Sequence, residues 1–204
     1  ALSGRADDNS AYNPKNFEQM EHDVENQEML VEVKDLSHVY YVKPIARLFG
    51  ANTPKVVNGM NLNLYAGEVY GLLGHNGAGK TTTIGAVAGE FPFSGGYVRY
   101  RHPDGHWLNV SDENMPFIRA NVGVCPQKDL VINEMTGKEH LEMFCRIRGV
   151  YEADAHAIAQ SVNLLEFWER RVEQYSGGMK RRIGLAMALV GKPRVIFLDE
   201  PTAG

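Results

Sequence analysis

The spacing of apolar and polar residues divides the chain into an early region rich in strands and a later region rich in helices. Apolar and polar residues alternate over 29–36 and again over 60–65, a period of two that predicts half-buried strands. Between them, residues 42–55 contain prolines and a glycine and favour a loop. The apolar run at 68–73 predicts a buried central strand, and residues 82–88 can begin a helix.

Later apolar runs predict further strands. Residues 97–100 and 122–125 are short strand candidates. Residues 194–198 contain four bulky apolar side chains, a composition typical of a fully buried parallel strand. The early strands would form an antiparallel sheet, and the later ones would belong to a parallel sheet.

The helical region lies between the last two of these strands. Thr136 and Glu139 match a capping box before apolar residues at helical spacing, and Gly149 is a helix stop. A second amphipathic helix begins at about Ala153, and Ser176 is a good N-cap for a third. We therefore expect a helical subdomain at about 128–180.

Composition narrows the class of protein. The 204 residues are 44% hydrophobic, enough for one good core, and the net charge of −4 argues against a nucleic-acid partner. Cys125 and Cys145 lie in apolar contexts that favour reduced, packed thiols. No run approaches the ~18 apolar residues of a membrane span. Residues 1–28 are acidic with few apolar side chains, so we expect a flexible linker there, and we expect the chain to be a segment of a longer protein.

The clearest motif is the stretch 74–81, GHNGAGKT, which fits the phosphate-binding pattern G-x-x-x-x-G-K-[ST] at every fixed position. Its glycines allow backbone N–H groups to turn inward, and the following helix directs the positive end of its dipole at the same point. Lys80 would reach the outer phosphates of a nucleoside triphosphate. The hydroxyl of Thr81 would ligate the accompanying magnesium.

Several polar residues at predicted strand ends or helix starts could complete such a site. Asp199 suits the orientation of magnesium and its waters, and Glu200 could accept a proton from an attacking water. Gln127 follows the strand at 122–125, where chemistry is found in parallel sheets. A fourth feature is the capped helix start at 176–179, whose uncovered amides suit an anion. Each of these features also fits a purely structural role when it is taken alone.

Two further features are less specific. Tyr40 or Tyr41 could offer a flat face to a base, although either also fits an ordinary strand aromatic. His102 and His106 flank Asp104 in a polar loop and suggest a metal site, but two histidines with no third ligand in view favour a solvated loop.

Four stretches in order, GHNGAGKTT, CPQ, YSGGMKRR and VIFLDEPTAG, resemble the Walker A, Q-loop, signature and Walker B motifs of ATP-binding cassette (ABC) transporter nucleotide-binding domains. The resemblance runs from about Met29 to the final residue. The first motif, GVCPQ and the S-G-G-M-K-R form of the signature are most similar to the A subfamily, whose members are mostly lipid exporters or flippases. A D-loop aspartate and a switch histidine are expected beyond Gly204, so the segment alone would hydrolyse ATP poorly.

The resemblance also implies roles for individual residues. Tyr40 would stack on adenine, with Tyr41 as the alternative. Glu200 would be the general base, with Gln127 and Lys80 as its catalytic partners. Magnesium would be held by Thr81, Gln127 and Asp199. The residues expected to contact ATP are Tyr40, Gly74, His75, Asn76, Gly77, Ala78, Gly79, Lys80, Thr81, Thr82 and Gln127, and, against a partner's nucleotide, Ser176, Gly177, Gly178 and Met179.

We therefore expect residues 29–204 to form an α/β domain with a P-loop NTPase core, an antiparallel β-subdomain and an inserted helical subdomain. Its predicted function is ATP hydrolysis that powers transport, with lipids as the expected cargo, at the cytosolic face of a membrane. The expected partners are a second nucleotide-binding domain and the transmembrane domains. One alternative is a soluble ABC ATPase of translation or DNA repair, which a long inserted coiled coil or a basic face would favour. Another is a structural ATP-binding domain without turnover, against which the intact Glu200 speaks.

Overall fold

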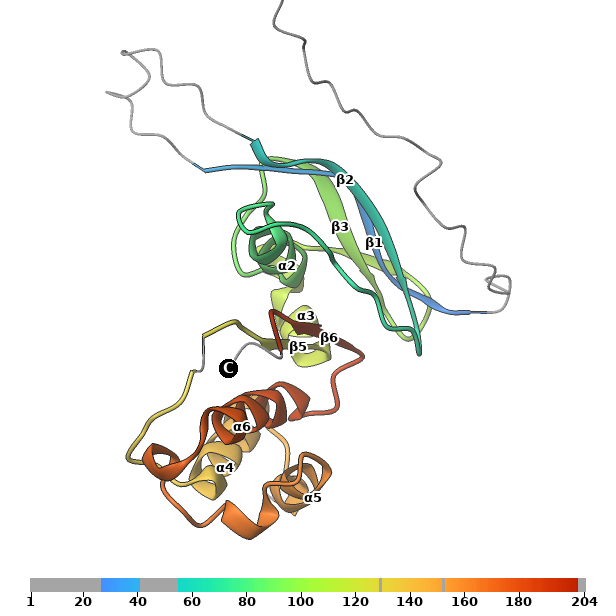
Figure 1. The fold of residues 1–204 in the computed structure, drawn as a ribbon. Coiled ribbons are helices and arrows are strands. Elements are labelled where there is room, and N and C mark those ends of the chain that lie inside the picture. Colours follow the sequence, from blue (N-terminus) through green and yellow to red (C-terminus); the bar gives the residue numbers. More distant parts are fainter. Residues whose placement is uncertain (1–26, 41–54, 129, 152, 202–204) are drawn as a thin grey trace, which may run out of the picture.

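The computed structural model describes residues 27–40, 55–128, 130–151 and 153–201. These residues form a four-stranded sheet, a two-stranded sheet and a group of helices, one below the other in Figure 1. Almost all of the predicted linker at 1–28 lies outside the described residues. Within the described residues, no helix combines the length and the apolar character needed to cross a bilayer.

The four-stranded sheet is the predicted antiparallel β-subdomain. It consists of β1 (Met29–Val39), β2 (Lys55–Tyr65), β3 (Gly95–Arg101) and β4 (Trp107–Asn109), in the order β2-β1-β3-β4. All of its neighbouring strands are antiparallel. The strand β2 begins earlier than the pattern at 60–65 predicted, and β4 is too short to give a sequence signal. The predicted loop at 42–55 otherwise lies outside the described residues.

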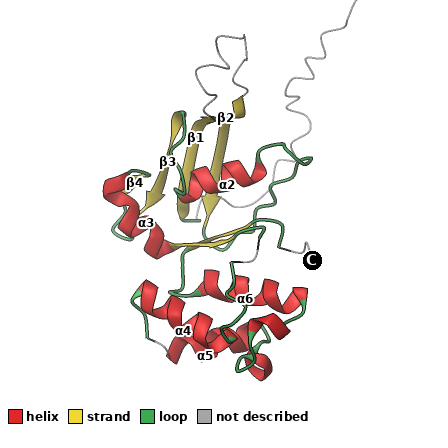
Figure 2. Ribbon diagram, turned by 90° about the vertical axis from the view of Figure 1, so that its left-hand side faces the viewer, coloured by secondary structure: helices red, strands yellow, loops and turns green. Residues whose placement is uncertain are grey.

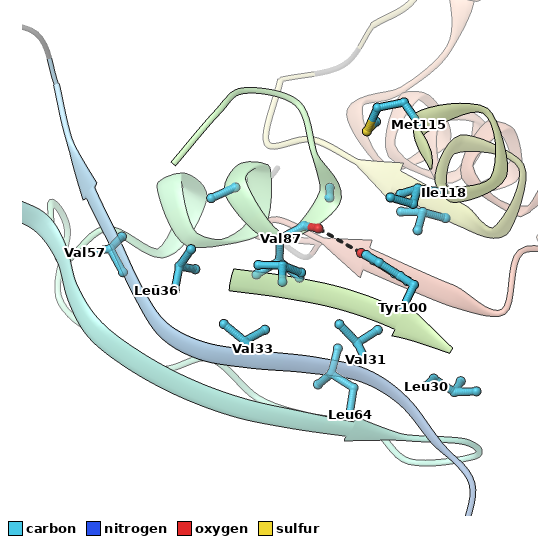
Figure 3. Close-up of a cluster of buried hydrophobic side chains, with 14 residues drawn as sticks. Leu30, Val31, Val33, Leu36, Val57, Leu64, Val87, Tyr100, Met115 and Ile118 are labelled. Atoms are coloured by element: carbon cyan, nitrogen blue, oxygen red, sulfur yellow. Dashed lines mark hydrogen bonds between the residues drawn. The ribbon is translucent and has the colours of Figure 1, made fainter. Parts of the chain in front are cut away.

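One face of this sheet is covered by helix α2 (Lys80–Ala88), as Figure 2 shows. Side chains of β1 that point to the same face, among them Val31 and Val33, meet Val87 of the helix (Figure 3). The buried hydroxyl of Tyr100 on β3 donates to the Val87 carbonyl oxygen at 2.9 Å, and burial raises the pKa of this tyrosine. The phosphate-binding motif is thus attached to a well-packed core.

The predicted central strand at 68–73 is wrong. This segment has no regular structure, and Val69 and Leu73 are 96% and 93% exposed. An extended apolar run becomes a strand only where a neighbouring strand pairs with its N–H and C=O groups, and no described strand pairs with this one. Tyr70 instead holds the segment to the end of β2, because its hydroxyl accepts the Tyr65 N–H at 3.2 Å. The same hydroxyl donates to the Glu68 carboxylate. Burial and the bond to Glu68 raise the pKa of Tyr70 to about 12.

The two-stranded sheet brings together β5 (Val122–Cys125) and β6 (Val195–Leu198), which are parallel and in register from Val122–Val195 to Cys125–Leu198. Helix α3 (Met115–Asn121), preceded by a 3-10 turn (Asp112–Asn114), leads into β5. The prediction of a fully buried strand at 194–198 is wrong. Ile196 and Leu198 alternate onto one face of β6 and remain 38% and 39% exposed.

The helical region contains α4 (Gly137–Arg148), α5 (Ala153–Ser161) and α6 (Gly177–Leu189), with 3-10 turns at Leu165–Phe167 and Val172–Gln174. The capping box and the Gly149 stop predicted for α4 are confirmed. The helices enclose a second core that includes Leu141, Leu164 and Ile183. Helix α6 begins inside the range predicted for the helical subdomain and continues past it, along β5.

Helix α6 lies very close to β5. A Cβ at Gly123 would stand 2.1 Å from the carbonyl oxygen of Ala188, so only glycine fits there. Arg148, the last residue of α4, donates to the Arg119 carbonyl and, at 3.0 Å, to the Val122 carbonyl. Burial lowers the pKa of Arg148. These contacts fix the helices against the strand that leads to Gln127.

Candidate functional site

The phosphate loop at 74–82 passes directly into α2. Its turn is closed by the Ala78 N–H, which donates to the His75 carbonyl at 3.1 Å, and the Thr83 N–H donates to the Gly79 carbonyl at 2.8 Å. Gly79 has φ of 89°, and a Cβ there would lie 2.6 Å from the Val56 carbonyl oxygen of β2. The glycine therefore allows the loop to turn against β2. A hollow of about 200 Å³ lies between the loop and this strand.

The side chain of Lys80 bends back over the loop. Its ammonium donates to the Gly74 carbonyl at 2.7 Å and to the His75 carbonyl at 3.2 Å. Carbonyl oxygens hold the cation at the mouth of the loop, where the backbone amides of the helix start also converge. A charge in this position suits a bound polyphosphate.

Thr81 reaches across the molecule to the end of β6. Its hydroxyl donates to the Asp199 carboxylate at 2.6 Å, although 118 positions separate the two residues. Asp199 is 4% exposed. A hydroxyl and a carboxylate side by side are hard oxygen ligands that suit magnesium, so this pair fits the metal predicted from the sequence.

Gln127 and Glu200 lie at the adjacent ends of β5 and β6. The Gln127 amide donates to the Glu200 carboxylate at 2.6 Å. Their proximity follows from the parallel register, which the Asp199 N–H extends by donating to the Cys125 carbonyl at 2.9 Å. Glu200 has φ of 48°, a left-handed conformation that is costly for a residue with a side chain and that is often found at functional sites.

Arg181 of α6 is a site residue that the sequence did not single out. Its guanidinium donates to the carbonyls of Pro126 and Asp199, to that of Gln127 at 3.5 Å and to that of Pro201 at 3.2 Å. One side chain thus links the segments after β5 and β6. The sequence pattern gives no signal for this role, because the hydrogen bonds described for the Arg181 side chain go to backbone carbonyls.

Tyr40 stands beside the other end of the phosphate loop. Its hydroxyl lies 3.0 Å from the Thr82 hydroxyl, and its ring makes an edge contact with His38 at 4.8 Å between centroids. Tyr40 is 53% exposed, which leaves room for a base to approach. Tyr41 lies outside the described residues.

The signature residues 176–179 are the candidates that the described hydrogen bonds do not join to the loop at 74–82. Ser176 caps α6 by accepting the Met179 N–H at 3.3 Å, and Gly177 and Gly178 face open space. This exposed helix start belongs to the helical region. The other candidates come from α2 and from the ends of β1, β5 and β6.

Together these features define a P-loop nucleotide-binding domain. They are a glycine loop at a helix start, a lysine over the mouth of that loop, a hydroxyl–carboxylate pair, and a glutamine–glutamate pair at adjacent strand ends. Residues 57–203 match the family model described as "ABC transporter". The chain belongs to the ABC transporter family.

Curated relatives agree with this assignment. "ATP-binding cassette sub-family A member 7" of Mus musculus is 40% identical over 171 residues, which cover 81% of this chain and 8% of that protein. "Phospholipid-transporting ATPase ABCA3" of Homo sapiens is 33% identical over 185 residues, which cover 88% of this chain and 10% of that protein. The chain therefore spans about a tenth of the length of these relatives.

Solved structures have the same fold. An ATP-binding cassette solved as a dimer in a post-hydrolysis state with ADP and Pi superposes with a TM-score of 0.70 at 22% identity, covering 85% of this chain and 75% of that one. The ATP-binding subunit of an ABC transporter gives 0.67 at 25% identity and covers 85% of this chain and 67% of the other. The predicted fold class, a P-loop α/β core with added strands and helices, is confirmed.

Proposed function

We propose that this chain is the ATP-binding and ATP-hydrolysing domain of a transporter of the A subfamily that moves lipids. The observation that carries the proposal is the convergence of two pairs, Thr81–Asp199 and Gln127–Glu200, on neighbouring elements beside the phosphate loop. The printed names of the relatives, one of them a phospholipid-transporting ATPase, support transport over the alternative of translation or DNA repair.

Each residue has a defined task in this mechanism. The loop amides and Lys80 bind and neutralise the outer phosphates of ATP, and Tyr40 offers its ring to the adenine. Thr81, Asp199 and Gln127 would hold magnesium, which supplies positive charge beside the phosphates. Glu200 accepts the proton of the attacking water, and its bond to Gln127 orients it. This acceptor favours turnover over purely structural ATP binding.

The exposed signature suggests how two such domains cooperate. Ser176 and the amides after it face open space on a helix start, so they can close over the nucleotide held by a second cassette. Closure and reopening would drive transmembrane domains from the cytosolic face of the membrane. A second cassette and those transmembrane domains are the proposed partners.

The proposal is tested by separating binding from turnover. Lys80→Ala removes a charged donor from the outer phosphates and should weaken ATP binding by about 1.5–3 kcal/mol in calorimetric titrations. Glu200→Gln keeps the shape of the side chain but cannot take the proton, so binding should persist while hydrolysis falls by about 10²–10⁴. Hydrolysis is measured in the whole transporter in lipid, because the second cassette contributes to the site.

Lys138→Ala is the matched control, since it removes an equal charge from the helical region, where Lys138 pairs with Glu169 at 3.1 Å. Its ATP affinity should equal that of the parent. Equal affinities for the parent and Lys80→Ala would refute the phosphate-binding role, and parental turnover by Glu200→Gln would refute the general base.

A further inference from the structure

The turn between β3 and β4 brings His102, Asp104 and His106 together. Two backbone bonds close it: the His102 N–H donates to the His106 carbonyl and the Gly105 N–H donates to the His102 carbonyl, each at 2.9 Å. Gly105 has φ of 100°, a conformation that glycine adopts at no cost. The two histidines are therefore fixed opposite each other at the end of the hairpin.

The three side chains point toward a common centre. Asp104 Oδ1 lies 2.8 Å from Nδ1 of His102 and also contacts Nδ1 of His106. The imidazole rings are stacked, with centroids 4.5 Å apart and planes 21° from parallel. His102 also packs on the ring of Phe117 in α3 at 4.8 Å, which anchors one ring of the group. Two histidines alone favoured a solvated loop, whereas the structure adds a carboxylate to both.

We propose that His102, Asp104 and His106 bind a divalent transition-metal ion, zinc, with water in the remaining position. Two imidazole nitrogens and one carboxylate oxygen are a donor set that zinc takes, whereas magnesium and calcium prefer oxygen ligands throughout. The site is separate from the magnesium position proposed at Thr81 and Asp199.

Ligation requires a rearrangement of the exposed side chains. The candidate ligand atoms lie within 4.8 Å of one another, while two ligands of one tetrahedral zinc ion at about 2.0–2.2 Å each stand roughly 3.3–3.6 Å apart. His106 and Asp104 are more than half exposed, so rotation of their side chains can close this difference and the ion can enter from solvent.

Zinc binding would stabilise the β3–β4 hairpin at the edge of the four-stranded sheet. The edge strand β4 has three residues and, among the described strands, pairs only with β3, so few backbone bonds hold it. An ion shared by residues on both sides of the turn stabilises the folded hairpin, since the unfolded chain offers no such preformed site. The expected role is structural.

The experiment uses the whole chain with reduced cysteines and excess MgCl₂, so that magnesium occupies the site at Thr81 and Asp199. Zinc binding is measured by competition with a chromophoric chelator. The parent should bind one equivalent of zinc, and the double variant His102→Asn, His106→Asn should lose it. Asp104→Asn should bind at least about 10-fold more weakly. Cobalt should give the parent the visible absorption of a four-coordinate nitrogen and oxygen site, and the double variant should lack this band.

His156→Asn is the control, because His156 is an exposed histidine on α5 whose ring contacts only Trp168 among the described ring contacts. It should bind zinc as the parent does. Circular dichroism and ATP binding confirm that every variant is folded. A double variant that keeps the equivalent of zinc, or a parent that binds less than one equivalent, would overturn the proposal, and neither result bears on the nucleotide site.

Discussion

Arg181 shows how much of the candidate site rests on hydrogen bonds from one side chain to the backbone. Its guanidinium holds the carbonyls of Pro126 and Asp199, and those of Gln127 and Pro201 lie within hydrogen-bonding reach. Because Gln127 and Glu200 follow those segments, Arg181 sets where the amide and the carboxylate stand. It is a positioning residue, since the hydrogen bonds described for its side chain hold the backbone of these two segments.

We predict that Arg181→Ala lowers ATP turnover by a factor on the order of 10² while ATP affinity changes little. The reason is that displacing the proposed general base, Glu200, by about 1 Å is costly for chemistry and not for binding. The neighbouring Arg182→Ala is the matched control. Arg182 donates to the Gly178 carbonyl at 3.4 Å and to the Asn163 carbonyl at 2.8 Å, both within the helical region. Steady-state kinetics that show the same loss in both variants would contradict the positioning role.

The packing of α6 on β5 depends on two glycines with different surroundings. Gly123 leaves no room for a Cβ beside the Ala188 carbonyl, whereas a Cβ at Gly184 would lie 3.6 Å from the Cys125 sulfur, an ordinary contact. Both glycines are buried in the same interface. Only the first is required by close approach of the backbone.

Gly123→Ala should therefore reduce the free energy of unfolding by about 1–3 kcal/mol, because α6 must move away from the strand. The melting temperature should fall by about 2–4 °C per kcal/mol. Gly184→Ala should be neutral or slightly stabilising, since alanine is the better helix former. Thermal unfolding followed by circular dichroism compares the two, and equal destabilisation would contradict the assigned close approach.

The capping box at the start of α4 makes the stability of the folded state depend on pH. The Glu139 carboxylate accepts the Thr136 N–H at 2.7 Å, and this bond, followed by one with the Thr136 side chain, lowers the pKa of Glu139. Because the pKa of Glu139 is lower in the folded state, its ionised carboxylate stabilises the fold at any pH above the unfolded-state pKa of about 4.3. This stabilisation is lost as the pH falls through the folded-state pKa.

We predict that Glu139→Gln removes this contribution. Melting temperatures of the parent and the variant should differ most near neutral pH. They should converge as the pH falls below the lowered folded pKa of Glu139, because the glutamate is then protonated in both states. Glu142→Gln, on the next turn of α4, controls for the loss of a negative charge. A difference between parent and Glu139→Gln that is the same at pH 3 and pH 7 would exclude the capping carboxylate as its source.

Taken as a whole, the fold could be predicted where local patterns decide the structure and could not where distant neighbours decide it. The strand at 122–125, the capped α4 and the phosphate loop followed from spacing and turn chemistry alone. Residues 68–73 and the exposed face of β6 did not, because their burial depends on what packs beside them. Arg181 was missed for the same reason, since its partners are backbone carbonyls that carry no sequence signal.

The parallel pairing of β5 with β6 affects the order in which the parts of the site can fold during synthesis. Val122 and Val195 are about 70 residues apart, and the entire helical region is the connection between them. The four-stranded sheet, by contrast, is complete in the chain by Asn109. Closing a long connection has an entropic cost that is recovered only when the connection itself is packed. During synthesis from the N-terminus, the phosphate loop can thus be folded early, and Asp199 and Glu200 arrive beside it only after the helices have assembled.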